Sequence, residues 1–123
     1  MGKHSQEFEA LCDDARTRVA EITIDELLAK RTRGEKLRLI DVREDDEWRA
    51  GRAQSAEHFG RGVIERDIIE KIPDKNEELV LYCGGGFRSA LAADNLQKMG
   101  YTRVRSLIGG WREWTKRNLP TEK

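Results

Sequence analysis

The stretch Leu79-Val-Leu-Tyr-Cys-Gly-Gly-Gly-Phe-Arg-Ser89 joins a continuously apolar run to a glycine triplet and then to an arginine and a serine. A short apolar run of this kind is typical of a central strand buried on both faces of a parallel sheet. Residues 88–99 continue as a predicted helix, with Lys98 in its last turn and Gly100 as its stop signal. The sequence therefore predicts a strand, a loop and a helix in succession, with Cys83 at the end of the strand.

The alternation of strand and helix extends over the rest of the chain. Runs of branched apolar residues predict strands at 20–23, 37–42, 79–83 and 103–107. Apolar periodicity and a Thr23–Glu26 capping box predict helices at 5–18, 23–30, 63–72 and 88–99, and a last helix from residue 109 onward. We expect a single helical turn at 44–50 and a loop at 51–62. This order predicts an α/β fold, in which a mainly parallel sheet carries helices on both faces and an extra helix precedes it.

The length of 123 residues fits one domain. We expect a helical extension at 1–19, a compact domain at 20–119 and a tail at 120–123. The extension is separated from the rest because chain termini are commonly attached loosely.

The composition excludes several classes of function. Lys and Arg number 23, as do Asp and Glu, so the formal net charge is zero and neither nucleic acid nor a membrane surface is an expected partner. No apolar run approaches the ~20 residues of a membrane span, and the N-terminus lacks the apolar stretch of a secretory signal, which predicts a cytoplasmic protein. Two cysteines and two histidines are scattered too widely for a zinc site, so we expect no metal and no cofactor.

The loop after Cys83 has the features of a reactive site. Gly84, Gly85 and Gly86 allow the backbone to curl around the sulfur, so that N–H groups point inward as an anion-binding nest. The start of the following helix adds further free N–H groups, and Arg88 adds a permanent positive charge. These surroundings favour a thiolate or a persulfide anion. The alternative is an inert buried cysteine followed by a turn; the glycine triplet makes the reactive site the better interpretation.

Four segments together resemble the single-domain rhodanese family. Cys83-Gly-Gly-Gly-Phe-Arg-Ser89 is similar to its Cys-x-x-Gly-x-Arg-Ser loop, and Asp41-Val-Arg-Glu44 to its Asp-Val-Arg-Glu strand end. Glu47-Trp48 followed by Gly51, and Gly109-Gly-Trp-Arg-Glu-Trp114, resemble two further family segments in the family's order. The chain departs from the family at Arg52, where a histidine is frequent, and at Ala53-Gln-Ser-Ala56, so the turn after Gly51 is expected to be built differently.

The resemblance implies a three-layer rhodanese fold and a sulfurtransferase that works through a persulfide on Cys83. The donor would be a small sulfur anion such as thiosulfate, and the acceptor cyanide or a thiol, with a sulfur-accepting protein as a further possible partner. The implied substrate-binding residues are those of the loop together with one arginine, namely Gly84, Gly85, Gly86, Phe87, Arg88, Ser89 and Arg43. For Arg43 the sequence leaves two roles open, attraction of the donor and an ion pair with Asp41, Glu44 or Glu47.

Two other functions compete with this interpretation. A sulfur carrier that hands sulfur between partner proteins would have an identical loop. A cysteine phosphatase would also place a cysteine at a strand end, but its loop has five residues between cysteine and arginine, and here only four separate Cys83 from Arg88. Two further residues receive structural interpretations: His58 as a surface histidine, and Cys12 as a small buried hydrophobe on the first helix.

Overall fold

The computed structural model describes residues 4–123, and its elements alternate as the sequence predicts. The helices are α1 (Gln6–Arg16), α2 (Ile24–Thr32), α3 (Asp45–Ala50), α4 (Ile64–Lys71), α5 (Phe87–Lys98) and α6 (Gly110–Lys116). The strands are β1 (Ala20–Ile22), β2 (Arg38–Asp41), β3 (Arg52–Ala53), β4 (Glu57–His58), β5 (Leu79–Tyr82), β6 (Val104–Leu107) and β7 (Thr121–Glu122). The predicted capping box is present, since the Thr23 hydroxyl accepts from the N–H of Glu26 and the Glu26 carboxylate accepts from the N–H of Thr23.

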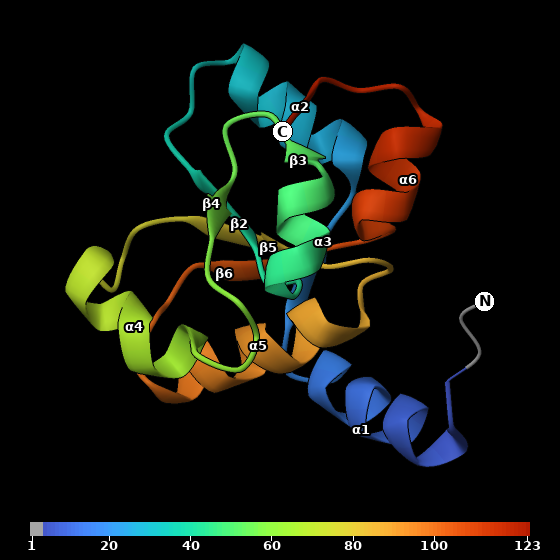
Figure 1. The fold of residues 1–123 in the computed structure, drawn as a ribbon. Coiled ribbons are helices and arrows are strands. Elements are labelled where there is room, and N and C mark those ends of the chain that lie inside the picture. The colour runs from blue at the N-terminus through green and yellow to red at the C-terminus, as the bar shows by residue number, and fades with distance from the viewer. Residues whose placement is uncertain (1–3) are drawn as a thin grey trace.

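Five strands form one parallel sheet in the order β1-β6-β5-β2-β4 (Figure 1). β5 lies at its centre and is buried along its whole length, as its continuously apolar sequence predicts. Because the strands are parallel, their carboxyl ends meet at one edge of the sheet, and Cys83 follows β5 at that edge.

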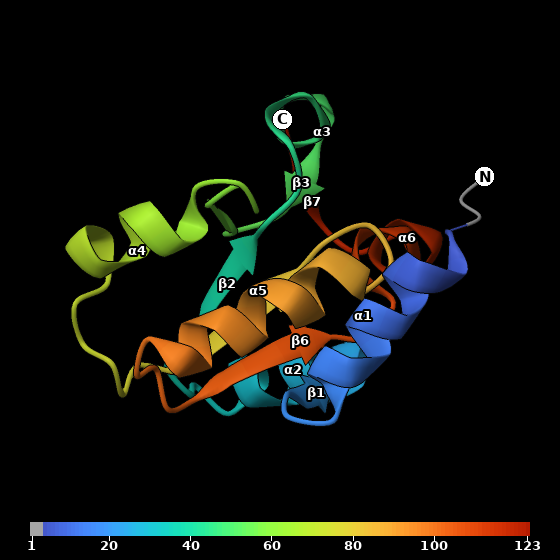
Figure 2. The same cartoon turned by 90° about the horizontal axis from the view of Figure 1, so that it is seen from below.

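Helices cover both faces of the sheet and divide the interior into two apolar clusters (Figure 2). On one face, Ile64, Ile68 and Leu96 of α4 and α5 pack with Leu79 and Leu81 of β5. On the other face, Leu27 of α2 and Trp114 of α6 pack with Val80 and Tyr82. Alternate residues of β5 thus supply the two clusters, as the two-residue period of a strand requires. The three-layer α/β fold is confirmed.

Helix α1 packs against α5 rather than extending away from the domain (Figure 2). Its Cys12 and Ala15 are buried, and Arg18 forms an ion pair with Asp94 of α5 at 2.8 Å. The predicted burial of Cys12 is confirmed. The domain boundaries remain a prediction, but residues 6–16 are held by side-chain contacts to the sheet's covering helix.

The segment 51–62 is not a plain loop, which corrects the prediction. Residues Glu57 and His58 form β4 and pair in parallel with Ile40 and Asp41, at the edge of the main sheet. No strand signal is present there in the sequence, because β4 is two residues long and polar. Its position is set by backbone pairing with β2 and not by apolar periodicity. β3 pairs with β7 in a separate antiparallel ribbon, which holds the tail residues Thr121 and Glu122.

Within residues 4–123, no helix has the length and the apolar character needed to cross a membrane.

Candidate active site

The sulfur of Cys83 is surrounded by hydrogen-bond donors. It accepts the N–H of Gly86 at 3.1 Å and the N–H of Ser89 at 3.4 Å. The Ser89 hydroxyl lies 3.5 Å from the sulfur and 2.7 Å from the hydroxyl of Ser106. Both serines are fully buried. Hydrogen bonds of this kind stabilise the anionic form of an acceptor more than its neutral form. Of the predicted nest, the structure places two N–H groups on the sulfur, one from the glycine triplet and one from the start of α5.

Neighbouring elements hold the loop's carbonyl groups outside the nest. The first N–H groups of α6 bind them: Trp111 donates to the oxygen of Cys83 at 2.8 Å, and Arg112 to that of Gly84 at 3.0 Å. Arg16 of α1 donates to the carbonyl oxygen of Gly86 at 3.0 Å. These three carbonyls belong to the peptides that carry the N–H groups of Gly84, Gly85 and Phe87, whereas the N–H groups that bind the sulfur belong to two other peptides. The contacts therefore fix the path of the loop around Cys83.

Two glycines make this arrangement possible. Gly86 has φ +98°, which a residue with a side chain rarely adopts. Gly110 has φ +50°, and a Cβ there would lie 2.3 Å from the carbonyl oxygen of Cys83. Gly110 lets α6 approach the loop closely enough for its N–H groups to bind the loop carbonyls.

Arg88 lies beside the sulfur, and its positive charge is paired with the carboxylate of Glu47. Its guanidinium donates to both carboxylate oxygens of Glu47, at 2.8 and 3.1 Å. This pair raises the pKa of Arg88 and lowers the pKa of Glu47. Arg112 lies on the other side of the loop, over Gly85, is exposed, and forms no ion pair with a carboxylate of residues 4–123. The site thus carries one paired and one unpaired guanidinium.

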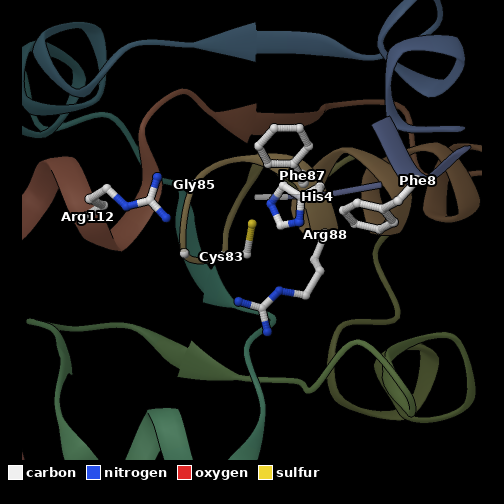
Figure 3. A pocket seen from close by; sticks show the side chains of 8 residues that line it. His4, Phe8, Cys83, Gly85, Phe87, Arg88 and Arg112 are labelled. Atoms are coloured by element: carbon white, nitrogen blue, oxygen red, sulfur yellow. The ribbon is translucent and has the colours of Figure 1, made fainter. Parts of the chain in front are cut away.

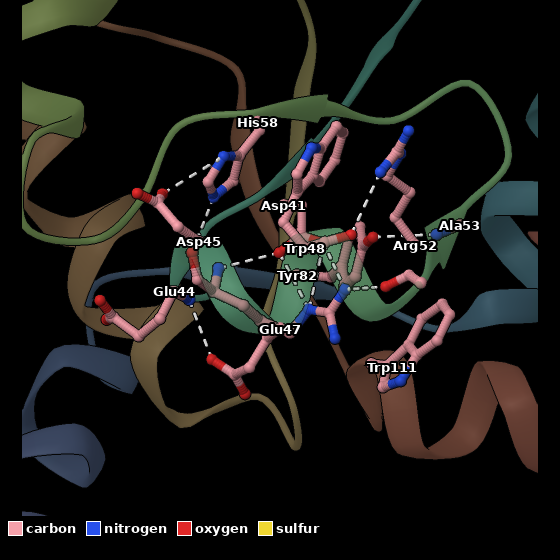
Figure 4. Close-up of polar contacts among 12 residues, drawn as sticks. Asp41, Glu44, Asp45, Glu47, Trp48, Arg52, Ala53, His58, Tyr82 and Trp111 are labelled. Atoms are coloured by element: carbon pink, nitrogen blue, oxygen red, sulfur yellow. Dashed lines mark hydrogen bonds and ion pairs between the residues drawn. The ribbon is translucent and has the colours of Figure 1, made fainter. Parts of the chain in front are cut away.

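Arg43 forms an ion pair with Asp41, one of the two roles that the sequence left open, and its part in substrate binding stays a prediction. Arg43 is only 2% exposed; its guanidinium binds Asp41 at 2.8 Å and the carbonyl oxygen of Gly51 at 2.6 Å. Its guanidinium also stacks over Trp111, 4.6 Å from the ring centroid, and Figure 4 draws the polar contacts around Asp41 with Trp111 beside them. Residues 41 and 43 share one side of an extended chain, so the two side chains lie next to each other.

His58 also lies outside the pocket. Its Nε2 is 2.9 Å from the carbonyl oxygen of Arg43, and its ring stacks on Trp48 with centroids 4.8 Å apart. Its Nδ1 lies 3.8 Å from a carboxylate oxygen of the exposed Asp45, a neighbour that the spacing of the sequence did not indicate. These contacts hold His58 against the segment after β2.

The cavity above Cys83 has a volume of about 310 Å³ and includes residues that the sequence did not reveal (Figure 3). His4 and Phe8 reach it from the N-terminal segment, and Arg112 reaches it from α6. Phe8 was recognisable only as a member of the apolar face of α1. Ser106 had a weak signal, as a hydroxyl residue in an otherwise apolar strand end. No pattern linked these residues to Cys83, because their contacts depend on the docking of α1 and α6.

This arrangement defines the class of α/β proteins that carry a cysteine in the loop between the central strand and the helix that follows it. Within that class, residues 23–117 match the model of the rhodanese-like domain family. The chain belongs to this family.

Relatives and solved structures agree with this assignment. "Putative sulfur carrier protein YrkF" of Bacillus subtilis is 29% identical over 114 residues, which are 93% of this chain and 57% of YrkF. "Putative thiosulfate sulfurtransferase, mitochondrial" of Schizosaccharomyces pombe is 34% identical over 102 residues, 72% of this chain and 70% of that protein. The structure of RPA3614 from Rhodopseudomonas palustris, described as a "Possible Tyrosine Phosphatase", has a TM-score of 0.80 at 27% identity and covers 99% of both chains.

Proposed function

We propose that the protein is a sulfurtransferase that moves a sulfane sulfur from an anionic donor, such as thiosulfate, to cyanide or a thiol through a persulfide on Cys83. One observation carries the proposal: the sulfur of Cys83 accepts two backbone N–H groups at the carboxyl edge of the sheet, inside a cavity large enough for a small molecule.

The reaction would proceed in two balanced steps. The Cys83 thiolate attacks the outer sulfur of thiosulfate, the S–S bond breaks, and sulfite leaves with its electron pair. Cyanide then attacks the outer sulfur of the persulfide, thiocyanate forms, and the thiolate of Cys83 is restored. Covalent catalysis of this kind replaces one difficult transfer by two easier ones.

The residues around Cys83 have distinct roles in these steps. The N–H groups of Gly86 and Ser89 stabilise the thiolate before attack and again after transfer, as an oxyanion hole stabilises charge. The guanidinium groups of Arg88 and Arg112 attract the anionic donor and counter the charge on the leaving sulfite. Arg43 has no place in this set, since Asp41 already neutralises it.

A sulfur carrier acting with partner proteins is the second candidate, and the similarity to YrkF favours it. The loop serves both functions equally well, because each needs a stabilised persulfide. A cytoplasmic location would suit either function and remains a prediction.

The test is exposure of the protein to thiosulfate, followed by intact mass measurement and peptide mapping. We expect the gain of one sulfur atom on Cys83 and its removal by cyanide. Turnover with free cyanide supports the enzyme, whereas loading without turnover supports the carrier. A sulfur mapped to Cys12, or hydrolysis of aryl phosphates at rates that match sulfur transfer, would overturn the proposal.

A further inference from the structure

The N-terminal helix contributes one wall of the cavity over Cys83. Phe87 of the loop lies against His4, with ring centroids 4.4 Å apart, and against Phe8, at 6.0 Å. His4 and Phe8 are themselves 4.9 Å apart, so the three rings form one cluster. We call His4, Phe8 and Phe87 the aromatic wall. Two of its three members precede residue 23, where the match to the family begins.

The aromatic wall is held in place by contacts that Cys12 and Arg16, further along α1, make with the loop. Cys12 is fully buried and its thiol donates to the carbonyl oxygen of Phe87 at 3.6 Å. Arg16 binds the carbonyl oxygen of Gly86 and also stacks on the ring of Phe87, 4.7 Å from the centroid. These contacts join α1 to the loop itself, so the position of the wall relative to Cys83 is set by the fold.

The cavity has two chemically different sides. Figure 3 shows the sulfur of Cys83 between the aromatic wall and Arg112, with Arg88 below. Inorganic thiosulfate could use the guanidinium groups and the N–H groups, but it has no apolar part to lie against three rings. An aromatic face over a cavity of about 310 Å³ instead fits a flat apolar group, through stacking and removal of apolar surface from water.

Building on the proposed function, we infer that His4 and Phe8 are specificity-determining residues of the sulfur-transfer site. They favour an anionic sulfur donor that carries an aromatic group over one that is purely inorganic. The oxygens of the donor's sulfonyl group would face Arg112, its aromatic group would lie against the wall, and its terminal sulfane sulfur would reach Cys83.

Two organic thiosulfonates test this inference, because they differ only in the group on sulfur. In each, the Cys83 thiolate takes the terminal sulfur, the S–S bond breaks, and a sulfinate leaves with the electron pair. The measurement is the second-order rate constant for loading of Cys83, followed by mass, with benzenethiosulfonate and with methanethiosulfonate. The ratio of the two rate constants is compared between variants, so that the different intrinsic reactivities of the donors cancel.

Phe8→Ala should lower the rate constant for benzenethiosulfonate about fivefold, the size of one lost aromatic contact, and change that for methanethiosulfonate less than twofold. Leu11→Ala is the matched control on the same helix, since Leu11 is 56% exposed and does not line the cavity; it should leave the ratio unchanged. His4→Ala removes an exposed side chain ahead of α1, so it leaves the fold intact, and should lower the ratio about twofold.

The ratio of the two rate constants shows whether or not the aromatic wall selects the donor. A ratio that falls with Phe8→Ala and His4→Ala supports the aromatic wall as a specificity element. Equal slowing of both donors in these variants, or no slowing of either, overturns it while leaving the proposed sulfur transfer intact. Failure of the parent protein to load sulfur from thiosulfate and from both thiosulfonates overturns the proposed function, and the specificity role with it. If Phe8→Ala does not fold, the ratio for His4→Ala decides.

Discussion

Cys12 and Cys83 are two buried thiols with surroundings of opposite polarity. Cys83 is 1% exposed, and its sulfur accepts N–H groups from Gly86 and Ser89. Cys12 is 0% exposed, and its thiol donates to the carbonyl oxygen of Phe87. N–H donors stabilise a thiolate, whereas a carbonyl acceptor needs the proton to remain on sulfur. The two thiols are equally buried, and the direction of the neighbouring dipoles is what distinguishes them.

Replacement of each cysteine by serine should give the largest difference between the two thiols. Cys83→Ser should abolish sulfur loading from thiosulfate, because a serine hydroxyl cannot form a persulfide. Cys12→Ser should retain loading within about twofold of the parent and destabilise the fold by roughly 1 kcal/mol, since a buried hydroxyl replaces a weakly polar thiol. Intact mass and thermal melts measure both effects. Loading that survives in Cys83→Ser would reverse the roles of the two cysteines.

The next largest effect should come from Gly110, which lets α6 approach the carbonyl of Cys83. In Gly110→Ala the new Cβ would lie 2.3 Å from that oxygen, so the loop or the helix must shift. A displacement of ~1 Å at a reacting group can cost about 100-fold in rate, and we expect thiosulfate–cyanide turnover to fall by about that factor.

Gly34→Ala provides the control for backbone strain. Gly34 also has positive φ, at +77°, but its added Cβ would meet nothing within 4 Å. The substitution should cost about 1–2 kcal/mol of stability and leave turnover unchanged. Equal loss of turnover in both variants would show that strain in the fold, and not the position of the loop, controls the reaction.

Arg88 tests whether charge as well as backbone geometry distinguishes Cys83. Arg88→Met keeps the apolar stem and removes the guanidinium that pairs with Glu47. We expect about a tenfold loss of kcat/KM for thiosulfate, the size of one lost charge-assisted hydrogen bond. Thermal melts should change little, because a partly exposed ion pair contributes weakly to stability. A large fall in melting temperature with unchanged kcat/KM would make Arg88 structural.

The smallest expected effect is a change with pH in the contribution of Cys12 to the free energy of unfolding. Burial raises the pKa of the Cys12 thiol, with the nearby Arg16 acting in the opposite direction. A raised folded-state pKa means that the folded chain holds the proton more tightly than the unfolded chain does. The stabilising contribution is therefore full below the usual thiol pKa of ~8.5 and is lost as pH rises toward the folded-state value.

The measurement is the free energy of unfolding between pH 7 and pH 10 in the Cys83→Ser background, which leaves Cys12 as the single thiol. The same chain with Cys12→Ala corrects for lysines and tyrosines that titrate in this range. The difference between the two should decline by no more than about 1.4 kcal/mol per pH unit, the limit for one proton. A difference that grows with pH would mean that Cys12 is stabilised as the thiolate.

The sequence predicted those parts of the site whose residues lie close together along the chain. Cys83, the glycine triplet and Arg88 lie within six residues, and the apolar run before them identifies the central strand. β4 was missed because Glu57 and His58 have no apolar pattern of their own and are placed by pairing with β2. For Arg43 the sequence allowed two roles, and only the folded position of Asp41 shows that the ion pair forms. His4 and Phe8 were invisible as site residues, since their contact with Phe87 depends on how α1 docks.

The capture of the loop carbonyls by α6 has a consequence for protein design. The path of the loop around Cys83 depends on the N–H groups of Trp111 and Arg112, more than twenty residues further along the chain. A transplant of residues 83–89 onto another parallel sheet would carry the glycines and the sulfur, but nothing would hold the peptide oxygens on the outer side. Such a graft should be a poor nucleophile until the recipient is also given a helix start, with a glycine at its first position, facing the loop from behind.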